Sequence, residues 1–520
     1  MATYYVANAG NDGNAGTMAS PWKTTAPVNA VSFNPGDMIL FNRGDTFRGY
    51  LQATSSGNVS NWITYGAYGT GNKPRIWGSK DASSTSDWVS AGGNMWRTAV
   101  TIRTDIANII FNSTNLCGVK KTTLGACTVQ GYFYINSSTS YVYLYSTSNP
   151  GTFYSHIELG GVYGENTIGI YSKSYIILEN LDVRHSHNNG IILSEANNII
   201  IQNNDILWCG GAYWSGATRM GNGIQMWEGN NNLSMMYNKI DRIYDAGISP
   251  QGEASYTMNN IMIQYNLITN CIYSFEMWTY VGQVVSNISI YNNTMRNAGS
   301  SWSEAQRPDP GNARHLMIWS LQQAVANFNI KNNIFDTCTE YALYCYFGVG
   351  SLLLDNNLWN VAFVADTNLG HHTTLAQWQV ASGVDVNSVD DDPLFVSASD
   401  SHLDTGSPAA GIGVNLGLLL DLDGNTVLNP PAAGSYEYGG TPPASIPVTA
   451  VTVVGAGNET VITVNGGTLQ MYAHIDPHDA TDQTVTWSVI NGTGSASISA
   501  SGLLTAISNG TVTVKATSNG

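Results

Sequence analysis

Seven short segments set the fold of this chain: IILENLDV (176–183), IIIQNNDIL (199–207), LSMMYNKID (233–241), IMIQYNLIT (261–269), ISIYNNTMR (288–296), FNIKNNIFD (328–336) and LLLDNNLWN (352–360). Their aligned asparagines are Asn180, Asn204, Asn238, Asn266, Asn293, Asn333 and Asn357, in steps of about 24, 34, 28, 27, 40 and 24 residues. A repeat in this range indicates one supersecondary unit stacked on itself. Because stacked asparagines can hydrogen-bond along the stack and tolerate left-handed backbone, the sequence predicts an asparagine ladder along a solenoid.

A second apolar strand follows each asparagine after a turn. These strands are GIILSE (190–195), GIQMWE (223–228), GISPQGE (247–253), SFEMWT (274–279), HLMIWS (315–320) and ALYCYF (342–347). Parallel strands need a long crossover, which here is the rest of the coil, so each strand is expected to pair with its counterpart one repeat later. Together with DDDPLF (390–395), HLDTGSPA (402–409) and GSYEYG (434–439), this pattern resembles the right-handed parallel β-helix of the pectate-lyase-like superfamily over residues 1–438.

The rest of the sequence divides the chain into parts. Residues 448–520 alternate apolar and polar positions and, through TLQMYAHIDP, VTWSV, GLLTA and GTVTVKATS, closely resemble a bacterial Ig-like group 2 domain. We therefore expect an all-β protein, a right-handed parallel β-helix solenoid followed by a small Ig-like β-sandwich. The predicted parts before that sandwich are an N-terminal cap (1–80), regular rungs (161–365), a closing segment (366–438) and a Gly/Pro linker (439–447).

Charge and composition restrict the partners of the chain. Asp plus Glu is 36 against 20 for Lys plus Arg, and the resulting net charge of −16 disfavours nucleic acid and anionic membrane surfaces. No apolar run reaches the roughly 18 residues of a membrane span, so membrane insertion is not expected. The start at Met1-Ala2 looks added to a mature secreted chain. We expect a bacterial monomer that is secreted or held at the cell surface.

The six cysteines show no metal-binding spacing. Cys209, Cys271 and Cys338 occupy the same position in different repeats, and we expect them to stack inside as small apolar side chains. Cys117 and Cys127 are predicted to pair across a hairpin.

Alternation along the second strands predicts which side chains face outward. The predicted inward residues are Ile191, Ile224, Ile248, Phe275, Leu316 and Leu343, and the predicted outward residues include Gln225, Gln251, Glu276, Trp227, Trp278, Trp319 and Tyr346. Exposed aromatic rings in a column are unfavourable on a soluble protein unless something covers them, and sugars present apolar faces that pack on such rings. We therefore predict a cleft that binds a polysaccharide or oligosaccharide.

Two insertions support such a cleft. They occupy 210–222 and 299–312, each just before a second strand, and insertions in solenoids often border the binding face. Tyr213, Trp214 and Trp302 are the expected wall residues, and the basic residues expected to point into the cleft are Arg219, Arg314 and its neighbour His315.

Paired carboxylates within the cleft predict the chemistry. Glycoside hydrolysis needs one carboxyl group to protonate the leaving oxygen and another to attack or to activate water. Glu276, on a partly apolar wall beside Trp278, suits the acid because burial raises a carboxyl pKa. Asp245, on a polar turn one rung earlier, suits the base or nucleophile, with Glu253 as the substitute for either. The sequence thus predicts a secreted glycoside hydrolase without a cofactor.

Three alternatives remain open. Glu195, Glu228 and Glu253 could form a column that binds Ca²⁺, a cation that prefers several oxygen ligands. A polysaccharide lyase, possibly calcium-dependent, would need a base and a cation or an arginine to neutralise a uronate, and Arg314 or Arg219 could serve. A non-catalytic glycan-binding surface protein or adhesin would use the aromatic column alone, since fold does not determine function.

Overall fold

The computed structural model describes residues 1–112, 116–215, 218–253, 255–280, 282–307, 313–320, 325–345, 351–362, 365–438, 448–455, 460–476, 485–500 and 502–518. The chain forms two compact units. The first comprises Met1–Lys80, Asp105–Asn108 and Leu159–Gly440, and the second comprises Asp81–Thr104, Ile109–Glu158 and Thr441–Gly520. None of the described helices has the length and apolar character needed to cross a bilayer.

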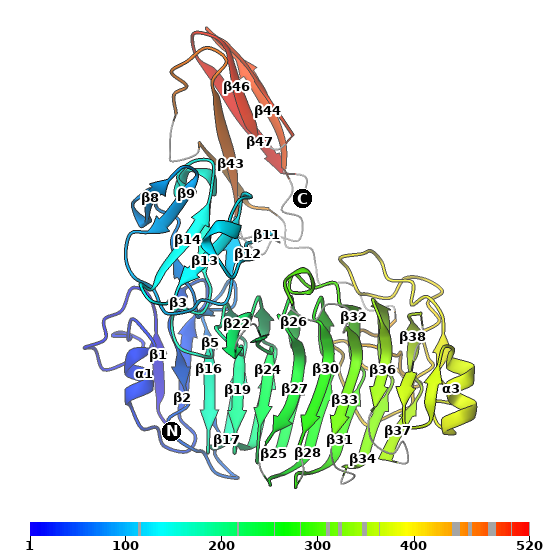
Figure 1. Ribbon diagram of the computed structural model, residues 1–520. Coiled ribbons are helices and arrows are strands. Elements are labelled where there is room, and N and C mark those ends of the chain that lie inside the picture. The colour runs from blue at the N-terminus through cyan, green and yellow to red at the C-terminus, as the bar shows by residue number, and fades with distance from the viewer. Residues whose placement is uncertain are drawn as a thin grey trace. The chain divides into compact units, whose positions relative to one another are not determined.

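Three ten-stranded sheets build the first unit (Figure 1). Sheet 1 contains β1 (Thr3–Val6), β2 (Met38–Asn42), β5 (Ile63–Tyr68), β17 (Ser174–Glu179), β20 (Asn197–Gln202), β25 (Asn231–Met236), β28 (Thr257–Gln264), β31 (Val284–Tyr291), β34 (Val325–Lys331) and β37 (Leu352–Asp355). Sheet 2 contains β4 (Leu51–Gln52), β16 (Ile168–Tyr171), β19 (Ile191–Ser194), β24 (Ile224–Trp227), β27 (Ala246–Gly252), β30 (Tyr273–Thr279), β33 (Arg314–Ser320), β36 (Tyr341–Cys345), β39 (Ala365–Thr367) and β40 (Gly370–His372). Sheet 3 contains β3 (Thr46–Arg48), β6 (Arg75–Trp77), β18 (Asp182–Arg184), β21 (Asp205–Leu207), β26 (Lys239–Asp241), β29 (Leu267–Thr269), β32 (Thr294–Ala298), β35 (Ile334–Cys338), β38 (Leu358–Asn360) and β41 (Val389–Asp390).

Each regular rung therefore has three strands, where the sequence suggested two. The third is the short run directly after the ladder asparagine, such as Lys239–Asp241. Strands pair in parallel with the equivalent strand of the next rung, as in Ile224 with Ile248 and Ile248 with Phe275. The exception in sheet 2 is β39, which pairs antiparallel with β40. The prediction of an all-β parallel β-helix is confirmed.

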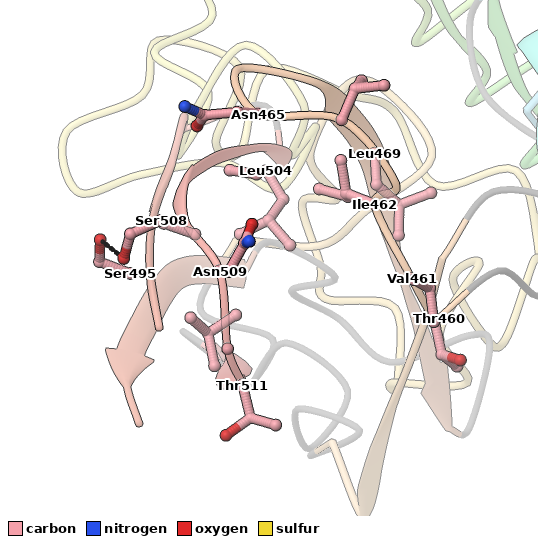
Figure 2. A pocket seen from close by; sticks show the side chains of 15 residues that line it. Thr460, Val461, Ile462, Asn465, Leu469, Ser495, Leu504, Ser508, Asn509 and Thr511 are labelled. Carbon is pink, nitrogen blue, oxygen red and sulfur yellow. Dashed lines mark hydrogen bonds between the residues drawn. The ribbon is translucent and has the colours of Figure 1, made fainter. Parts of the chain in front are cut away.

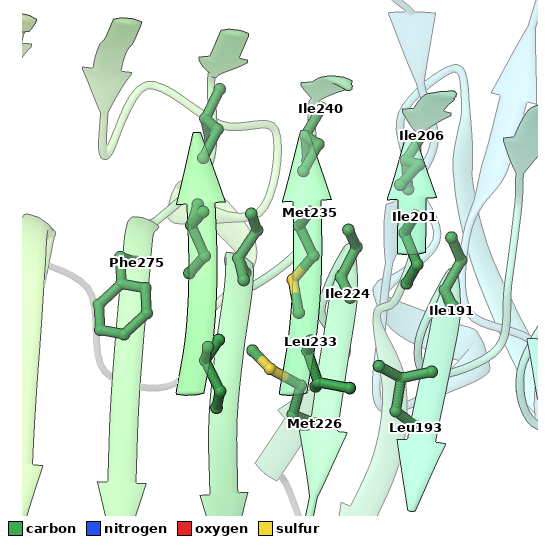
Figure 3. Packing of buried hydrophobic residues seen from close by; sticks show 14 of the residues in the cluster. Ile191, Leu193, Ile201, Ile206, Ile224, Met226, Leu233, Met235, Ile240 and Phe275 are labelled. Carbon is green, nitrogen blue, oxygen red and sulfur yellow. The ribbon is translucent and has the colours of Figure 1, made fainter. Parts of the chain in front are cut away.

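Stacked apolar side chains fill the coil. All six residues predicted to point inward from the second strands, from Ile191 to Leu343, are fully buried. Figure 3 shows how Ile191, Leu193, Ile224 and Met226 line the interior from sheet 2. Residues of sheets 1 and 3, including Ile201 and Ile240, pack in the same cluster. The stack buries apolar surface in every rung, and burial stabilises by about 25 cal/mol per Å² of apolar area.

The asparagine ladder is continuous from Asn204 to Asn357. In each step the backbone N–H and the Nδ2 of one asparagine donate to Oδ1 of the next, at 2.9–3.0 Å for Asn266 and Asn293, for example. The predicted first member, Asn180, lies one position away from this ladder. Asn180 has a left-handed φ of 59°, close to the 55° of Asn203, the residue before the ladder asparagine Asn204. The residue in the ladder position of this rung is Leu181, which donates its backbone N–H to Oδ1 of Asn204 at 3.0 Å. The left-handed residue is thus the one before the ladder asparagine.

Asp385 closes the ladder at its far end. Asn357 donates from Nδ2 to Oδ1 of Asp385 at 3.2 Å and from its backbone N–H to Ser388 Oγ at 2.8 Å. Trp359 Nε1 donates to the other carboxylate oxygen at 3.1 Å. Asp385 follows α3 (Leu375–Ser382), so the closing segment supplies the last rung with its partners.

The remaining closing segment returns along the coil. Asn332 donates to the carbonyl of Val414 at 2.8 Å, and Ser435 Oγ lies 3.0 Å from Thr294 Oγ1. His402 lies between Asp400 and Asp423, with its Nε2 2.5 Å from Asp423. These contacts cover sheet 3 with chain that follows the last rung.

All six cysteines are free. The predicted pairing of Cys117 with Cys127 is wrong; the strand around Cys117 instead pairs with Ile110 and Phe111. Cys209 and Cys271 are buried in the coil as predicted, and Cys338 is partly buried.

Fifteen further strands lie wholly or partly in the second unit. They are the strands β7 (Lys80–Asp81), β8 (Trp88–Gly92), β9 (Met95–Thr98), β10 (Ile109–Phe111), β11 (Leu116–Cys117), β12 (Val119–Lys120), β13 (Tyr132–Asn136), β14 (Tyr141–Tyr145), β15 (Ile157–Leu159), β42 (Ala450–Gly455), β43 (Thr468–Asp476), β44 (Val485–Asn491), β45 (Ser495–Ile498), β46 (Leu503–Ser508) and β47 (Val512–Ser518). Within it, β13 pairs antiparallel with β14, and β44 pairs antiparallel with β47.

A pocket of about 370 Å³ lies among the C-terminal strands (Figure 2). Its lining includes Ile462, Leu469 and Leu504 with Asn465 and Asn509, and it has no acidic or basic side chain. Because acid–base chemistry needs titratable groups, this pocket is not the candidate catalytic centre. The predicted linker, 439–447, lies outside the described residues.

Candidate active site

The outward face of sheet 2 carries the predicted columns in register. Gln225 pairs with Ser249 and Trp227 with Gln251, one rung apart. Gln251 then pairs with Trp278, and Glu276 and Trp278 pair with Met317 and Trp319. These side chains lie on parallel neighbours spaced by about 4.8 Å, so one face presents a continuous row of polar and aromatic groups.

Glu276 is the most strongly perturbed carboxyl group on this face. It lies on β30, retains partial solvent exposure, and accepts hydrogen bonds at Oε2 from Gln251 Nε2 at 2.7 Å and Ser249 Oγ at 3.1 Å. Burial, followed by the charge of Asp245, raises the pKa of Glu276 to about 8, although the two hydrogen bonds and Arg307 act against this rise. Burial and the neighbouring acid thus favour the protonated form of Glu276.

Asp245 precedes β27 and is held by an arginine. Arg307 Nη1 lies 2.7 Å from Asp245 Oδ1, and both side chains are largely buried. The Arg307 guanidinium also lies 5.8 Å from the ring of Tyr273 and 5.7 Å from that of Tyr244. Burial, then Asp245 and Glu276, raises the pKa of Tyr273, which places this phenol beside both acids.

A bend lies at the start of the second strands, as at Gly223. Asn222 precedes the bend and Gln225 follows it, yet their side chains share a hydrogen bond. One rung later the equivalent residues are Ala246 and Ser249, which are small and fully buried. The charge of Asp245 contributes to the raised pKa of Glu276, as expected when one acid lies near another.

Aromatic rings continue this face. Trp278 and Trp319 stack with ring centroids 5.3 Å apart and an interplanar angle of 14°. Tyr280 packs edge-on against Trp278 at 4.8 Å. Trp227, Trp278 and Trp319 are all partly exposed, so the aromatic surface is accessible. Tyr346, predicted as the next member of the column, lies outside the described residues.

The insertions fold against each other. The first contains the hairpin of β22 (Ala212–Ser215) and β23 (Thr218–Met220), and the second contains the 3₁₀ turn Glu304–Gln306. Arg219 donates to Gln306 Oε1 at 3.1 Å and to the carbonyl of Gly211 at 2.6 Å. It is buried, so the expectation that it points into the cleft is wrong: it joins the two loops.

The predicted wall residues have different environments. Trp302 donates from Nε1 to the carbonyl of Arg242 at 2.9 Å and packs against Trp208 and Tyr244, so it anchors its loop. Tyr213 is half-buried, and its backbone N–H donates to Asp105 at 2.8 Å. Trp214 is 67% exposed and is the side chain of this hairpin most available for contact.

Three predicted substrate-binding residues are enclosed by protein. His315 is fully buried and hydrogen-bonded through Nδ1 to Ser274 at 3.0 Å, so it cannot contact a substrate. Burial lowers the pKa of His315 to about 3. Gln225 is also buried, bonded to Asn222, and forms part of the floor. Arg314 is largely buried, with its guanidinium 5.0 Å from the Tyr341 ring and 4.8 Å from the Tyr344 ring.

Glu253 does not belong to the acid pair. It follows β27 whereas Asp245 precedes it, so a seven-residue strand separates them, and its carboxylate is exposed. At about 3.3 Å per residue this separation excludes Glu253 as a direct partner of Asp245.

The predicted calcium column is also not formed. Among the described residues, the group of three acids or histidines whose ligand atoms lie within 4.8 Å of one another is Asp81, His156 and Glu158, not Glu195, Glu228 and Glu253. Glu195 instead accepts from Ser172 Oγ at 2.8 Å, and Glu228 accepts the backbone N–H of Glu253 at 2.8 Å. The Asp81 group belongs to the second unit and not to sheet 2.

Two important members of the site were missed by sequence reasoning. Ser249 is in the predicted outward column, but its contact with Glu276 depends on the register between rungs. Arg307 lies in the second insertion, which was expected to border the cleft. Its place in that insertion is the one sequence feature that could have pointed to its ion pair with Asp245.

Two family models match the chain. Residues 107–295 match the model of the right handed beta helix region, and residues 447–520 match that of the bacterial Ig-like domain, group 2. No curated protein sequence matches significantly.

Similar folds occur among solved structures. Pectate lyase Pel9A is 14% identical, with a TM-score of 0.45 over 84% of this chain and 96% of that chain. XylC in complex with xylose is 13% identical, with a TM-score of 0.41 over 69% and 76% of the two chains. The GH136 lacto-N-biosidase from Eubacterium ramulus is 15% identical, with a TM-score of 0.37 over 70% and 65%. At these identities the similarity concerns the fold alone.

Proposed function

We propose that this right-handed parallel β-helix with a bacterial Ig-like domain is a glycoside hydrolase, secreted or held at the cell surface, that cleaves a poly- or oligosaccharide. The observation that carries the proposal is the contrast between two neighbouring carboxyl groups, Glu276 and Asp245. Glu276 has a pKa raised by burial and by Asp245, whereas Asp245 forms an ion pair with Arg307. Glycoside hydrolysis needs a carboxyl group that donates a proton and a second carboxylate nearby, and these two residues can supply them.

In the proposed reaction, Glu276 donates its proton to the glycosidic oxygen as the bond from that oxygen to the anomeric carbon breaks. Asp245 either takes a proton from the attacking water or attacks the anomeric carbon itself. Arg307 orients the Asp245 carboxylate through their ion pair. The stacked Trp278 and Trp319 supply a flat apolar surface for a neighbouring sugar ring.

Hydrolysis is tested by assaying a glycan panel for new reducing ends. On the substrate so identified, Glu276→Gln and Asp245→Asn should each lower kcat by about 10²- to 10⁴-fold, the range for loss of a positioned acid or base. Both variants should keep the melting temperature and the circular dichroism spectrum of the native protein within small changes. Near-native rates in both variants would contradict the assignment.

A lyase is the second candidate, because the Arg307 guanidinium lies 2.7 Å from Asp245 and 5.8 Å from the Tyr273 ring. Such a guanidinium group could neutralise a uronate carboxylate. β-Elimination leaves an unsaturated product that absorbs near the ultraviolet edge, and hydrolysis does not. Unsaturated products would therefore replace the hydrolase proposal, whereas glycan binding without any product would favour an adhesin.

A further inference from the structure

A closed network of three side chains lies beneath the proposed acid. Gln251 and Ser249 are on β27, and Glu276 is on the adjacent β30. Gln251 Nε2 lies 2.7 Å from Glu276 Oε2 and 2.9 Å from Ser249 Oγ. Ser249 Oγ lies 3.1 Å from the same Oε2. Both contacts to the carboxyl group therefore converge on one of its two oxygens.

The chemistry of these donors determines where the acid proton resides. An amide nitrogen donates and does not accept, so Gln251 directs one N–H to Oε2 of Glu276 and the other to Ser249 Oγ. Ser249 then accepts from Gln251 and directs its own hydrogen to Oε2. Oε2 accepts two hydrogen bonds, which leaves Oε1 as the oxygen that carries the proton of neutral Glu276.

We infer that Ser249 and Gln251 are positioning residues, which hold the transferable proton of Glu276 on Oε1. This inference rests on the proposed function and identifies a role for Gln251 other than the predicted one of binding substrate. Both N–H groups of Gln251 are engaged within the network, so it acts on the substrate through Glu276.

The network also sets how readily Glu276 loses its proton. Hydrogen bonds to the ionised form favour that form, so the donors of Ser249 and Gln251 lower the pKa of Glu276 against the effects of burial and Asp245. Arg307 also lowers this pKa, and Tyr273 is the other titratable group that feels the charge of Glu276. Removal of the Gln251 donor should therefore make Glu276 a weaker acid.

The test uses Gln251→Met and Ser249→Ala in the full chain. Carbon NMR of ¹³C-labelled glutamate side chains, with Glu276→Gln to assign the signal, measures the titration of Glu276 without any substrate. We expect the midpoint to move up by about one pH unit in Gln251→Met, and less in Ser249→Ala, because each variant removes a hydrogen bond that favours the ionised form of Glu276. The basic limb of kcat/KM should move by the same amount, with kcat reduced about tenfold and KM little changed.

Gln202→Met is the matched control. Gln202 Nε2 donates to Glu179 Oε2 at 2.7 Å, the same pair of groups at the same distance, on sheet 1. Its substitution should leave both the Glu276 titration and the rate profile unchanged. Ser249→Ala keeps the test valid if Gln251→Met does not fold, as judged by circular dichroism.

Two results would overturn the inference. An unchanged midpoint would mean that the network does not act on Glu276, and a lower midpoint would mean that the Gln251 carbonyl accepts the acid proton from Oε2. Failure of the proposed function gives a different result: the midpoint rises in Gln251→Met, but no variant and no native sample hydrolyses any glycan. The NMR and kinetic measurements thus separate the two claims.

Discussion

At the scale of single residues, Glu276 and Asp245 have different partners although they lie on neighbouring rungs. Glu276 receives neutral donors and loses solvent, whereas Asp245 receives the positive charge of Arg307. A charged partner favours ionisation and desolvation opposes it, so the environment rather than the residue type assigns the roles.

The raised pKa of Glu276 predicts a particular pH profile. Because the acid must carry its proton, the rate should decline as pH rises through about 8, the value to which burial and Asp245 raise the pKa of Glu276. Initial rates between about pH 4 and 10 measure this limb. In Glu276→Gln the residual rate should lose the limb, and a basic limb that persists unchanged in this variant would mean that another group titrates.

Sequence alone predicted the two acids but not their partners. Alternation and turn position indicated Glu276 and Asp245, whereas Arg307 comes from an insertion whose path the repeat does not encode. His315 was misassigned because alternation fails at the bend. There two successive residues, such as Ser274 and Phe275, both face the interior. A periodicity of two holds only within a regular strand.

At the scale of elements, parallel pairing between rungs converts single aromatic residues into a surface. Trp278 pairs with Trp319 in register, so their rings stack without help from loops. The surface continues towards Gln251 and Trp227 on earlier rungs.

Removal of these rings should weaken substrate binding. Trp278→Ala and Trp319→Ala should each raise KM about three- to tenfold, since such aromatic contacts contribute about 0.5–1.5 kcal/mol, while kcat changes less. Steady-state kinetics on an oligosaccharide measures both. The matched control is Trp62→Ala: Trp62 packs edge-on to Tyr175 at 5.5 Å, beside sheet 1, and its loss should leave KM unchanged. Equal effects of all three variants would argue against a sugar-binding column.

The asparagine ladder predicts a second element-scale result. Asn266 is fully buried, donates to Asn293 and the carbonyls of Met235 and Gln264, and accepts from Asn238. Asn266→Ala should lower the free energy of unfolding by about 3 kcal/mol or more, because each unsatisfied buried group costs about 1–3 kcal/mol. Urea denaturation measures this loss.

Asn180→Ala provides the comparison. Asn180 lies in the left-handed position before the ladder, so its substitution should cost only about 1 kcal/mol of backbone strain. Equal losses at Asn180 and Asn266 would contradict the observed register. The sequence repeat predicted the ladder, but two adjacent asparagines in most repeats left its position ambiguous by one residue.

At the scale of the whole molecule, several buried groups bind protons more tightly in the folded state than in the unfolded chain. Burial raises the pKa of Asp385 to about 6 and that of Glu437 to about 7. Burial acts to lower the pKa of His402, but its hydrogen bonds to Asp423 and Asp400 raise it overall. The pKa of Glu276 is also raised.

These shifts predict that the β-helix is most stable under mildly acidic conditions. A group whose pKa is raised in the folded state stabilises the fold at pH values below its pKa in the unfolded chain, which is about 4 for the acids and about 6.5 for histidine. This stabilisation is lost as the pH rises through the pKa of the folded state. The free energy of unfolding should therefore fall by a few kcal/mol between about pH 5 and 9. Asp12 and Asp400 have lowered pKa values and oppose this trend only at more acidic pH. Calorimetry across this range measures the trend, and a stability that rises from pH 5 to 9 would contradict it.

The side-chain amides of the asparagine ladder form a row of aligned dipoles along the coil. In each step from Asn204 to Asn357 the Nδ2 of one asparagine donates towards the next rung, and the amide oxygen that accepts this bond points towards the previous rung. The side-chain dipoles therefore align head to tail, with their positive ends towards the C-terminal rungs. Asp385, which stands where another asparagine would follow, places a carboxylate against that positive end. The negative charge of Asp385 is favourable at the positive end of these aligned dipoles. The same charge would be unfavourable at the opposite, negative end of the ladder.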